Sequence, residues 1–259
     1  GAAAAWLSLL TLLVLLPLMA SGAEGGSYAT VLLAAIFVAA LFASSLHFIL
    51  GPGGMHSFGH AAYFGLGAYG AALLVRTLDL PMEAALLLGP LAAAAGSLLY
   101  GWCCVRLSGV YLTMLTLAFA QISWAIVFQW DDFTGGSNGL TGVWPPEWAS
   151  QGPAFYWLAL GICALGIYLL RRLLFSPLGY ALRASRDSAL RADAIGIDVR
   201  RIQWTAFVIA GLFAGLAGAL FAFSKGGVAP DAMSVTKSVD ALVMVLLGGV
   251  QTLAGPVVG

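Results

Sequence analysis

Long apolar stretches that contain no Asp, Glu, Lys or Arg follow one another along most of this chain. A transmembrane helix needs about 20 consecutive apolar residues. The charge-free stretches of about that length or more are 1–23, 25–75, 84–105, 107–130, 148–170, 202–224 and 241–259. The second is long enough for two crossings and is interrupted by Gly51-Pro52-Gly53-Gly54. We therefore predict an all-α polytopic membrane protein with about eight transmembrane helices, since helices satisfy their own backbone hydrogen bonds in lipid.

The composition agrees with this pattern and removes several classes of function. Of 259 residues, 61% are hydrophobic and 8% are charged, whereas a soluble domain carries roughly 25% charged residues. The net charge is zero, and nothing in its distribution supports a nucleic-acid partner. The three cysteines lie inside apolar stretches, so we expect buried free thiols and no metal site. We expect residues 1–259 to form a single transmembrane domain.

Basic residues are concentrated in one polar segment between two apolar stretches. This segment holds seven of the eleven basic residues, namely Arg171, Arg172, Arg183, Arg186, Arg191, Arg200 and Arg201. Arginine-rich loops stay on the cytoplasmic side of a membrane. We therefore predict a cytoplasmic loop at 171–203 and, one crossing earlier, an external loop at 131–153.

The cytoplasmic loop has the signals of a surface helix. Ser176-Pro177 is a favourable helix start, and Gly196 is a favourable stop. Arg183, Asp187 and Arg191 recur every four residues and predict an ion-paired stripe. The opposite face carries mostly small residues, which are Leu178, Ala181, Leu182, Ser185, Ala189 and Ala192. Such a helix either docks into a groove of another protein or lies at the lipid headgroups.

Glycine and proline interrupt the apolar pattern at two places, one in each half of the chain. The first interruption, at 51–60, leads into a helix with closely spaced glycines, and the second lies at 247–256. Paired interrupted helices point to an inverted repeat with the transport path at the interface of the two halves, whereas the alternative for the first is an ordinary hairpin with a close-packed face. The candidate residues of the translocation path are Gly53, Gly54, Ser57, His60, Gly248, Gly249 and Thr252. His60 is either a solute contact or a packed residue with a satisfied hydrogen bond.

The external loop contains a glycine-rich run that resembles a phosphate-binding loop only superficially. The run lacks the lysine and the spacing of such a loop, so we do not expect this chain to bind ATP. The run is either a set of tight turns or a contact for an external partner. Its candidate residues are Thr134, Gly135, Gly136, Ser137, Asn138 and Gly139.

Five motifs in order along the chain resemble LivM-type permease subunits of branched-chain amino acid ABC importers. The motifs are Ser57 to Tyr63 with the following Gly65 to Tyr69, Leu107 to Ala120, Thr134 to Leu140, Ser176 to Gly196, and Gly248 to Gly259. Each motif alone is weak, but the five together are specific and cover most of the chain.

The resemblance implies a non-enzymatic transport subunit, with many passes through the bacterial inner membrane and surrounded by lipid. It implies two ATP-binding partner subunits, a second permease subunit, a periplasmic solute-binding protein and a small solute, with no cofactor in this chain. The family's coupling helix would lie within 176–200, so the expected contacts with the ATPase are Arg183, Arg186, Asp187, Ala192, Asp193, Ala194 and Gly196. Family members usually continue past the closing glycine, so we expect the chain to be incomplete at its C-terminus.

Two departures from the family pattern and three rival functions remain. Met55-His56 stands where the family commonly has a glutamine and an aliphatic residue, and Ala189 where an acid is common. Related permeases carry urea and short amides, which is the alternative solute class. A stand-alone secondary transporter would want an acid or a lysine inside a span for ion coupling, and the predicted spans contain none. An intramembrane enzyme would need convergent catalytic groups, which we do not find.

Overall fold

Six long helices form the framework of the molecule. The computed structural model describes residues 26–150, 154–250, 252 and 255–258, so the span predicted at 1–23 lies outside the described residues. Within those ranges, six helices are long and apolar enough to cross a membrane. They are α2 (Gly26–Leu50), α3 (His60–Leu78), α4 (Met82–Cys104), α5 (Val110–Gln129), α8 (Ala154–Leu174) and α11 (Val199–Lys225). The predicted division of the stretch 25–75 into two helices is thereby confirmed.

The last apolar stretch does not form the single span predicted for 241–259. A helix of 14 residues, α12 (Val235–Gly248), is followed by an interruption and then by α13 (Gly255–Val258). The helix starts before the charge-free stretch because Ser234 caps it, its hydroxyl accepting a hydrogen bond from the Lys237 amide. It ends at Gly249, whose φ of 96° is unfavourable for any residue with a side chain. Eight spanning helices are therefore not found in the described part, and the inverted repeat stays a prediction.

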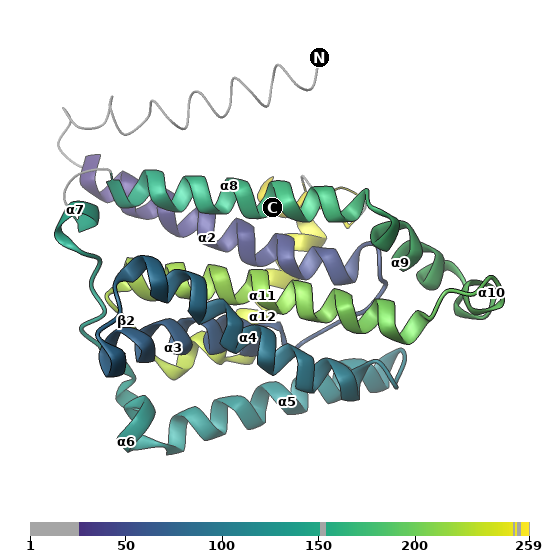
Figure 1. Ribbon diagram of the computed structural model, residues 1–259, viewed down its shortest axis with the longest axis horizontal. Helices are drawn as coiled ribbons and strands as arrows, with labels where there is room; N and C mark the ends of the chain where they lie inside the picture. Colours follow the sequence, from purple (N-terminus) through teal and green to yellow (C-terminus); the bar gives the residue numbers. More distant parts are fainter. Residues whose placement is uncertain (1–25, 151–153, 251, 253–254, 259) are drawn as a thin grey trace, which may run out of the picture.

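The shorter elements gather at the two ends of the bundle (Figure 1). At one end, which we call the arginine end, lie α9 (Pro177–Asp187) and α10 (Ala189–Ala194). At the opposite end lie α6 (Asp131–Thr134) and the antiparallel pair of strands β1 (Leu140–Thr141) and β2 (Gly227–Val228). The remaining short elements are η1 (Gly136–Asn138), α7 (Glu147–Ser150) and η2 (Pro230–Met233). The two loops that charge placed on opposite sides of the membrane thus lie at opposite ends.

The core is built on close contact of α11 with α3 and α4. Gly67 of α3 lies directly against the backbone of Gly215 in α11, where a side chain on Gly67 would collide. Gly218 approaches the carbonyl of Phe64 in the same way. Small residues allow helices in lipid to gain van der Waals contact between their backbones. The close-packed glycine face predicted for the helix after the first interruption is therefore confirmed.

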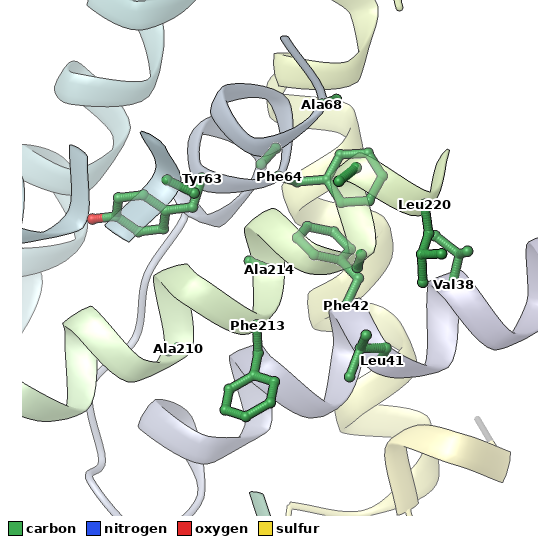
Figure 2. Packing of buried hydrophobic residues seen from close by; sticks show 14 of the residues in the cluster. Val38, Leu41, Phe42, Tyr63, Phe64, Ala68, Ala210, Phe213, Ala214 and Leu220 are labelled. Atoms are coloured by element: carbon green, nitrogen blue, oxygen red, sulfur yellow. The ribbon is translucent and has the colours of Figure 1, made fainter. Parts of the chain in front are cut away.

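Aromatic side chains fill the space between α2 and this three-helix core. The ring of Phe42, from α2, lies 4.8 Å from the ring of Phe64 between centroids, and both are buried (Figure 2). Leu220 of α11 and Val38 of α2 pack at the side of this pair. The packing fixes α2 against α3, and the first interruption connects these two helices.

Candidate functional site

The first interruption brings the start of α3 back inside the bundle. His60, the first residue of α3, places its Nε2 2.8 Å from the hydroxyl of Ser45 in α2. Ser45 lies five residues before the end of α2 at Leu50, which corresponds to about 7–8 Å along the helix axis. Residues 51–59 therefore run back along α2 by that distance, from its end toward Ser45, without forming a helix. The interruption is a segment that re-enters the bundle, which goes beyond an ordinary hairpin turn.

His60 sits in the buried core behind this segment. Its imidazole stacks on the ring of Phe42 at 5.4 Å, and its side chain has no exposed surface. Because the Ser45 hydroxyl donates to the Phe42 carbonyl at 2.6 Å, it accepts a hydrogen bond from His60 Nε2–H. His60 Nδ1 has no hydrogen-bond partner within the described residues. These contacts favour the interpretation of His60 as a packed residue whose hydrogen bond is made to a hydroxyl.

The two glycine-rich interruptions touch each other. His47, near the end of α2, donates from Nε2 to the carbonyl of Val250 at 2.9 Å. A side chain at Gly51 would lie 2.9 Å from the same carbonyl oxygen. In the second interruption, the backbones of Gly248 and Gly255 are in direct contact. Two segments about 200 residues apart in sequence therefore form one unit at this point of the bundle.

The other residues predicted for the translocation path have different surroundings. Gly53 is buried against the last turn of α2, and Ser57 is buried with a hydroxyl that has no partner among the described residues. Gly249 has positive φ and open space around it, and Thr252 is exposed. The structure therefore brings the predicted residues to one region, where some are packed and others face outward.

Arg186 connects the arginine end with the first interruption. Its Nη1 donates to the carbonyl of Gly51 at 2.7 Å, and its side chain lies across Gly54. A side chain on Gly54 would come within 2.6 Å of Arg186 Cγ, and the φ of 62° at this residue also favours glycine. The sequence analysis expected Arg186 to contact the ATPase, and that role stays a prediction. In the structure the residue is exposed, and its guanidinium bonds both the Gly51 carbonyl and the Asp187 carboxylate.

The helix predicted from Ser176 to Gly196 is in fact two helices. The chain is extended at Ser188, with φ −163° and ψ 104°, and the Ser188 hydroxyl accepts from the Arg191 amide to start α10. The predicted stripe of ion pairs is broken for this reason, and Asp187 instead lies 3.3 Å from its neighbour Arg186. Ser176 does not cap α9 with its side chain, which donates to the carbonyl three residues earlier.

The small-residue face of the loop, for which docking and contact with lipid headgroups were both open, is only partly covered. Leu178 and Ala181 are half-buried, and Ala189 is exposed. Leu182, Ser185 and Ala192 of the small-residue face are all buried within this chain. The most exposed large apolar side chains of the loop are Leu190, at 87%, and Ile195, at 75%. These two residues were missed because periodicity tells which residues share a face and does not tell which face is covered.

The remaining residues predicted for coupling lie on or near the surface of the arginine end. Arg183 is half-buried, with its guanidinium 5.5 Å from the ring of Phe175 and 5.6 Å from the ring of Tyr180. The exposed ones are Asp193, Ala194 and Gly196. Gly196 has a φ of 87°, which is consistent with its predicted role as a helix stop.

The glycine-rich run at the opposite end is fixed to the framework. Thr134 is buried and donates its hydroxyl to the carbonyls of Val127 and Trp130, at 2.6 and 2.7 Å. Gly136 has positive φ, and a side chain there would collide with the carboxylate of Asp131. These contacts favour the interpretation of the run as tight turns.

The same run is held to the end of α11. Strand β1 pairs with β2, and Gly139 lies against the carbonyl of Val228, where only a glycine fits. Gly135 also has positive φ and packs on the Gly139 carbonyl. Ser137 and Asn138 are exposed. If an external partner binds this run, these two side chains are available to it.

A bundle of six helices that are long and apolar enough to cross a membrane defines a multi-pass membrane protein. The comparison with known proteins agrees. The chain belongs to the family described as branched-chain amino acid transport system / permease component, whose model matches residues 28–259. This confirms the resemblance noted in the sequence and places the chain in the bacterial inner membrane as a non-enzymatic subunit.

Individual relatives support the same family. The permease protein LivM of the high-affinity branched-chain amino acid transport system of Escherichia coli K12 is 32% identical over 79% of this chain and 54% of its own length. The autoinducer 2 import system permease protein LsrC of Photorhabdus laumondii is 26% identical over 66% of this chain and 49% of its own. The chain thus spans about half the length of the curated relatives it matches. No solved structure matched the chain.

Proposed function

We propose that this chain is the transmembrane permease subunit of an ATP-driven importer for branched-chain or other amino acids. Its partners would be a second permease subunit, two ATP-binding subunits and a periplasmic solute-binding protein. Solute would pass from the binding protein through the bundle to the cytoplasm. Family membership and the name of the similar LivM protein support this solute class. Urea or a short amide is the alternative solute.

The hydrogen bond from Arg186 to Gly51 carries the mechanistic part of this proposal. Arg186 belongs to α9 at the arginine end, and Gly51 belongs to the first interruption, which touches the second through His47 and Val250. A displacement of α9 would therefore move both interruptions together. This is the direct route by which a movement at the arginine end would reach the segments that control access to solute.

The ATPase would be engaged mainly by α10. Leu190 of α10 and Ile195, which directly follows this helix, are exposed within the described residues, and an apolar surface of this kind suits a groove of another protein. The neighbouring Asp193, Ala194 and Gly196 would contact the same groove. Arg183, Asp187 and Ala192 would hold α9 and α10 in place, since they pack or pair within this chain. The arginine end would face the cytoplasm, and Ser137 and Asn138 would face the external partner.

The test is transport by the reconstituted complex with Arg186→Ala. We expect the complex to assemble and to hydrolyse ATP, while amino acid uptake falls at least tenfold, because motion of α9 no longer reaches Gly51. Arg186→Lys keeps the contact of the aliphatic stem with Gly54 and one donor, so we expect intermediate uptake. ATP hydrolysis and uptake of labelled leucine are measured on the same proteoliposomes.

Arg200→Ala is the matched control. Arg200 is exposed at the same end and has no hydrogen bond or ion pair among the described residues, so its loss removes the same charge without the link. Wild-type uptake by Arg186→Ala would refute the transmission route. A wild-type complex that takes up no amino acid on ATP addition would refute the function itself.

A further inference from the structure

Two ionisable side chains lie within the middle part of the bundle. Lys237 and Asp240 belong to α12, which lies behind α11 and away from both ends of the long axis (Figure 1). The Ser238 hydroxyl accepts a hydrogen bond from the Ala61 amide at 2.9 Å, which fixes this part of α12 beside the first turn of α3. Lys237 lies near Phe64 and Phe221, which belong to helices long enough to cross a membrane, and Asp240 follows one turn later on α12.

One face of α12 is left uncovered by the described part of the chain. Its buried residues are Ser238, Ala241 and Val245. The exposed residues recur at steps of three, one, three, three and one, and are Thr236, Val239, Asp240, Val243, Leu246 and Leu247. This spacing puts them on a single stripe along the helix. Asp240 is therefore displayed on an otherwise largely apolar surface.

Neither charge is neutralised by a neighbour. Within the described ranges, no basic group lies within 4.0 Å of the Asp240 carboxylate, and Lys237 forms no ion pair. Lys237 Nζ instead lies near the rings of Phe64 and Phe221, at 6.0 and 5.6 Å from their centroids. Residues three apart on a helix are neighbours, with about 5–6 Å between their Cβ atoms, so an unpaired acid and an unpaired base stand one turn apart.

A lone carboxylate does not face lipid, because hydrocarbon cannot solvate it. Intramembrane charges occur where they face a water-filled cavity or a partner group. The uncovered stripe of α12 also lies next to the joined interruptions, since α12 continues directly into the second one. An aqueous path along this stripe accounts for both observations.

We propose that the uncovered face of α12 lines the solute path and that Asp240, on this face, and the half-buried Lys237 beside it bind the two charged groups of a zwitterionic α-amino acid. Asp240 takes the ammonium and Lys237 takes the carboxylate, while Val239 and Val243 border the aliphatic side chain. The proposal rests on the function proposed above. It makes α12 a solute-binding element in addition to a part of the second interruption.

The experiment compares Asp240→Asn and Lys237→Gln in the full complex, reconstituted into liposomes with its ATPase subunits and binding protein. We expect each change to lower ATP-driven leucine uptake at least tenfold, with assembly and basal ATP hydrolysis unchanged. Two competitors separate the roles of the two residues. The amine formed by decarboxylation of leucine keeps only the ammonium group, so it should compete with leucine uptake in Lys237→Gln and fail to compete in Asp240→Asn. The carboxylate formed by deamination of leucine keeps only the carboxylate, so it should compete in Asp240→Asn and fail to compete in Lys237→Gln. Asp132→Asn, which neutralises an exposed acid in α6, should stay within twofold of wild type.

Accessibility gives a second readout that does not depend on uptake. In a Cys103→Ser background, Asp240→Cys should react with a membrane-impermeant thiol reagent, and saturating leucine should slow this reaction. Wild-type uptake by Asp240→Asn would overturn the proposal. Loss of the second permease subunit from Asp240→Asn would overturn it as well, by assigning the acid to an ion pair between subunits. If wild type itself shows no ATP-driven amino acid uptake, the underlying function fails first.

Discussion

The two ends of the bundle are built in opposite ways. At the end opposite the arginine end, the glycine-rich run is fixed by the buried Thr134 hydroxyl, by turns that admit only glycine, and by pairing of β1 with β2. At the arginine end, α10 extends from the bundle with exposed apolar side chains, and Arg186 supplies the link from α9 to the first interruption. A rigid end suits a surface that must keep its shape. A projecting end that reaches the first interruption through Arg186 suits a part that moves.

The largest expected effect comes from placing charges on the exposed apolar residues of the arginine end. The double change Leu190→Asp and Ile195→Asp should lower co-purification of the ATPase subunit at least tenfold, because a charge on the docking surface must be desolvated on binding. The chain should still insert, since both side chains are exposed. Co-purification from detergent, with quantification of the membrane-inserted chain, checks this outcome.

Leu107→Asp is the control for that prediction. Leu107 follows α4 near the same end of the bundle and is 41% exposed, but it lies outside α10. It should retain the ATPase. Equal loss in both variants would mean that any acidic change at this end disrupts the complex, and α10 would have no special role.

A smaller effect is expected from rigidity at the opposite end. Gly136→Ala puts a side chain onto the Asp131 carboxylate at a positive φ, and such strain costs on the order of 1–3 kcal/mol. The midpoint of thermal unfolding in detergent should fall, while ATP hydrolysis by the complex stays unchanged. Gly142→Ala is matched, since Gly142 has a φ of 88° but open space around it, and should lower the midpoint less. The reverse order would contradict the importance of the Asp131 contact.

The smallest expected effect on stability comes from removing a single hydroxyl at the end opposite the arginine end. Thr134→Val keeps the shape of a buried side chain and removes its donor to Val127 and Trp130. One such hydrogen bond contributes about 0.5–1.5 kcal/mol to the free energy of unfolding. Chemical denaturation in detergent should detect this loss. Thr113→Val is the control: Thr113 is only half-buried, and its hydroxyl also bonds a carbonyl at 2.6 Å, so its loss should change stability less.

Much of the bundle could be predicted from charge alone. Charged residues are costly in lipid, so charge-free stretches mark spans, and the six long helices follow these stretches closely. The same reasoning failed at α12. Restricting spans to charge-free residues excluded Lys237 and Asp240, although Ser234 gave a helix-start signal before them.

The loop at the arginine end was harder to predict for a different reason. Serine at position 188 is a weak helix breaker, so periodicity continued across it, whereas the Ser188 hydroxyl in fact caps a second helix. The direction of Arg186 depends on Gly51 and Gly54, more than 130 residues earlier in the chain. A contact over that sequence distance is set by tertiary packing, and no local pattern encodes it.

The pairing of β1 with β2 also has a consequence for how the chain is made. Val228 is synthesised about 90 residues after Leu140, and at typical elongation rates of 5–20 residues per second the delay is on the order of 5–20 seconds. Until α11 has emerged and inserted, the glycine-rich run has no strand to pair with. The glycine-rich run therefore reaches its final pairing only after most of the bundle has been synthesised.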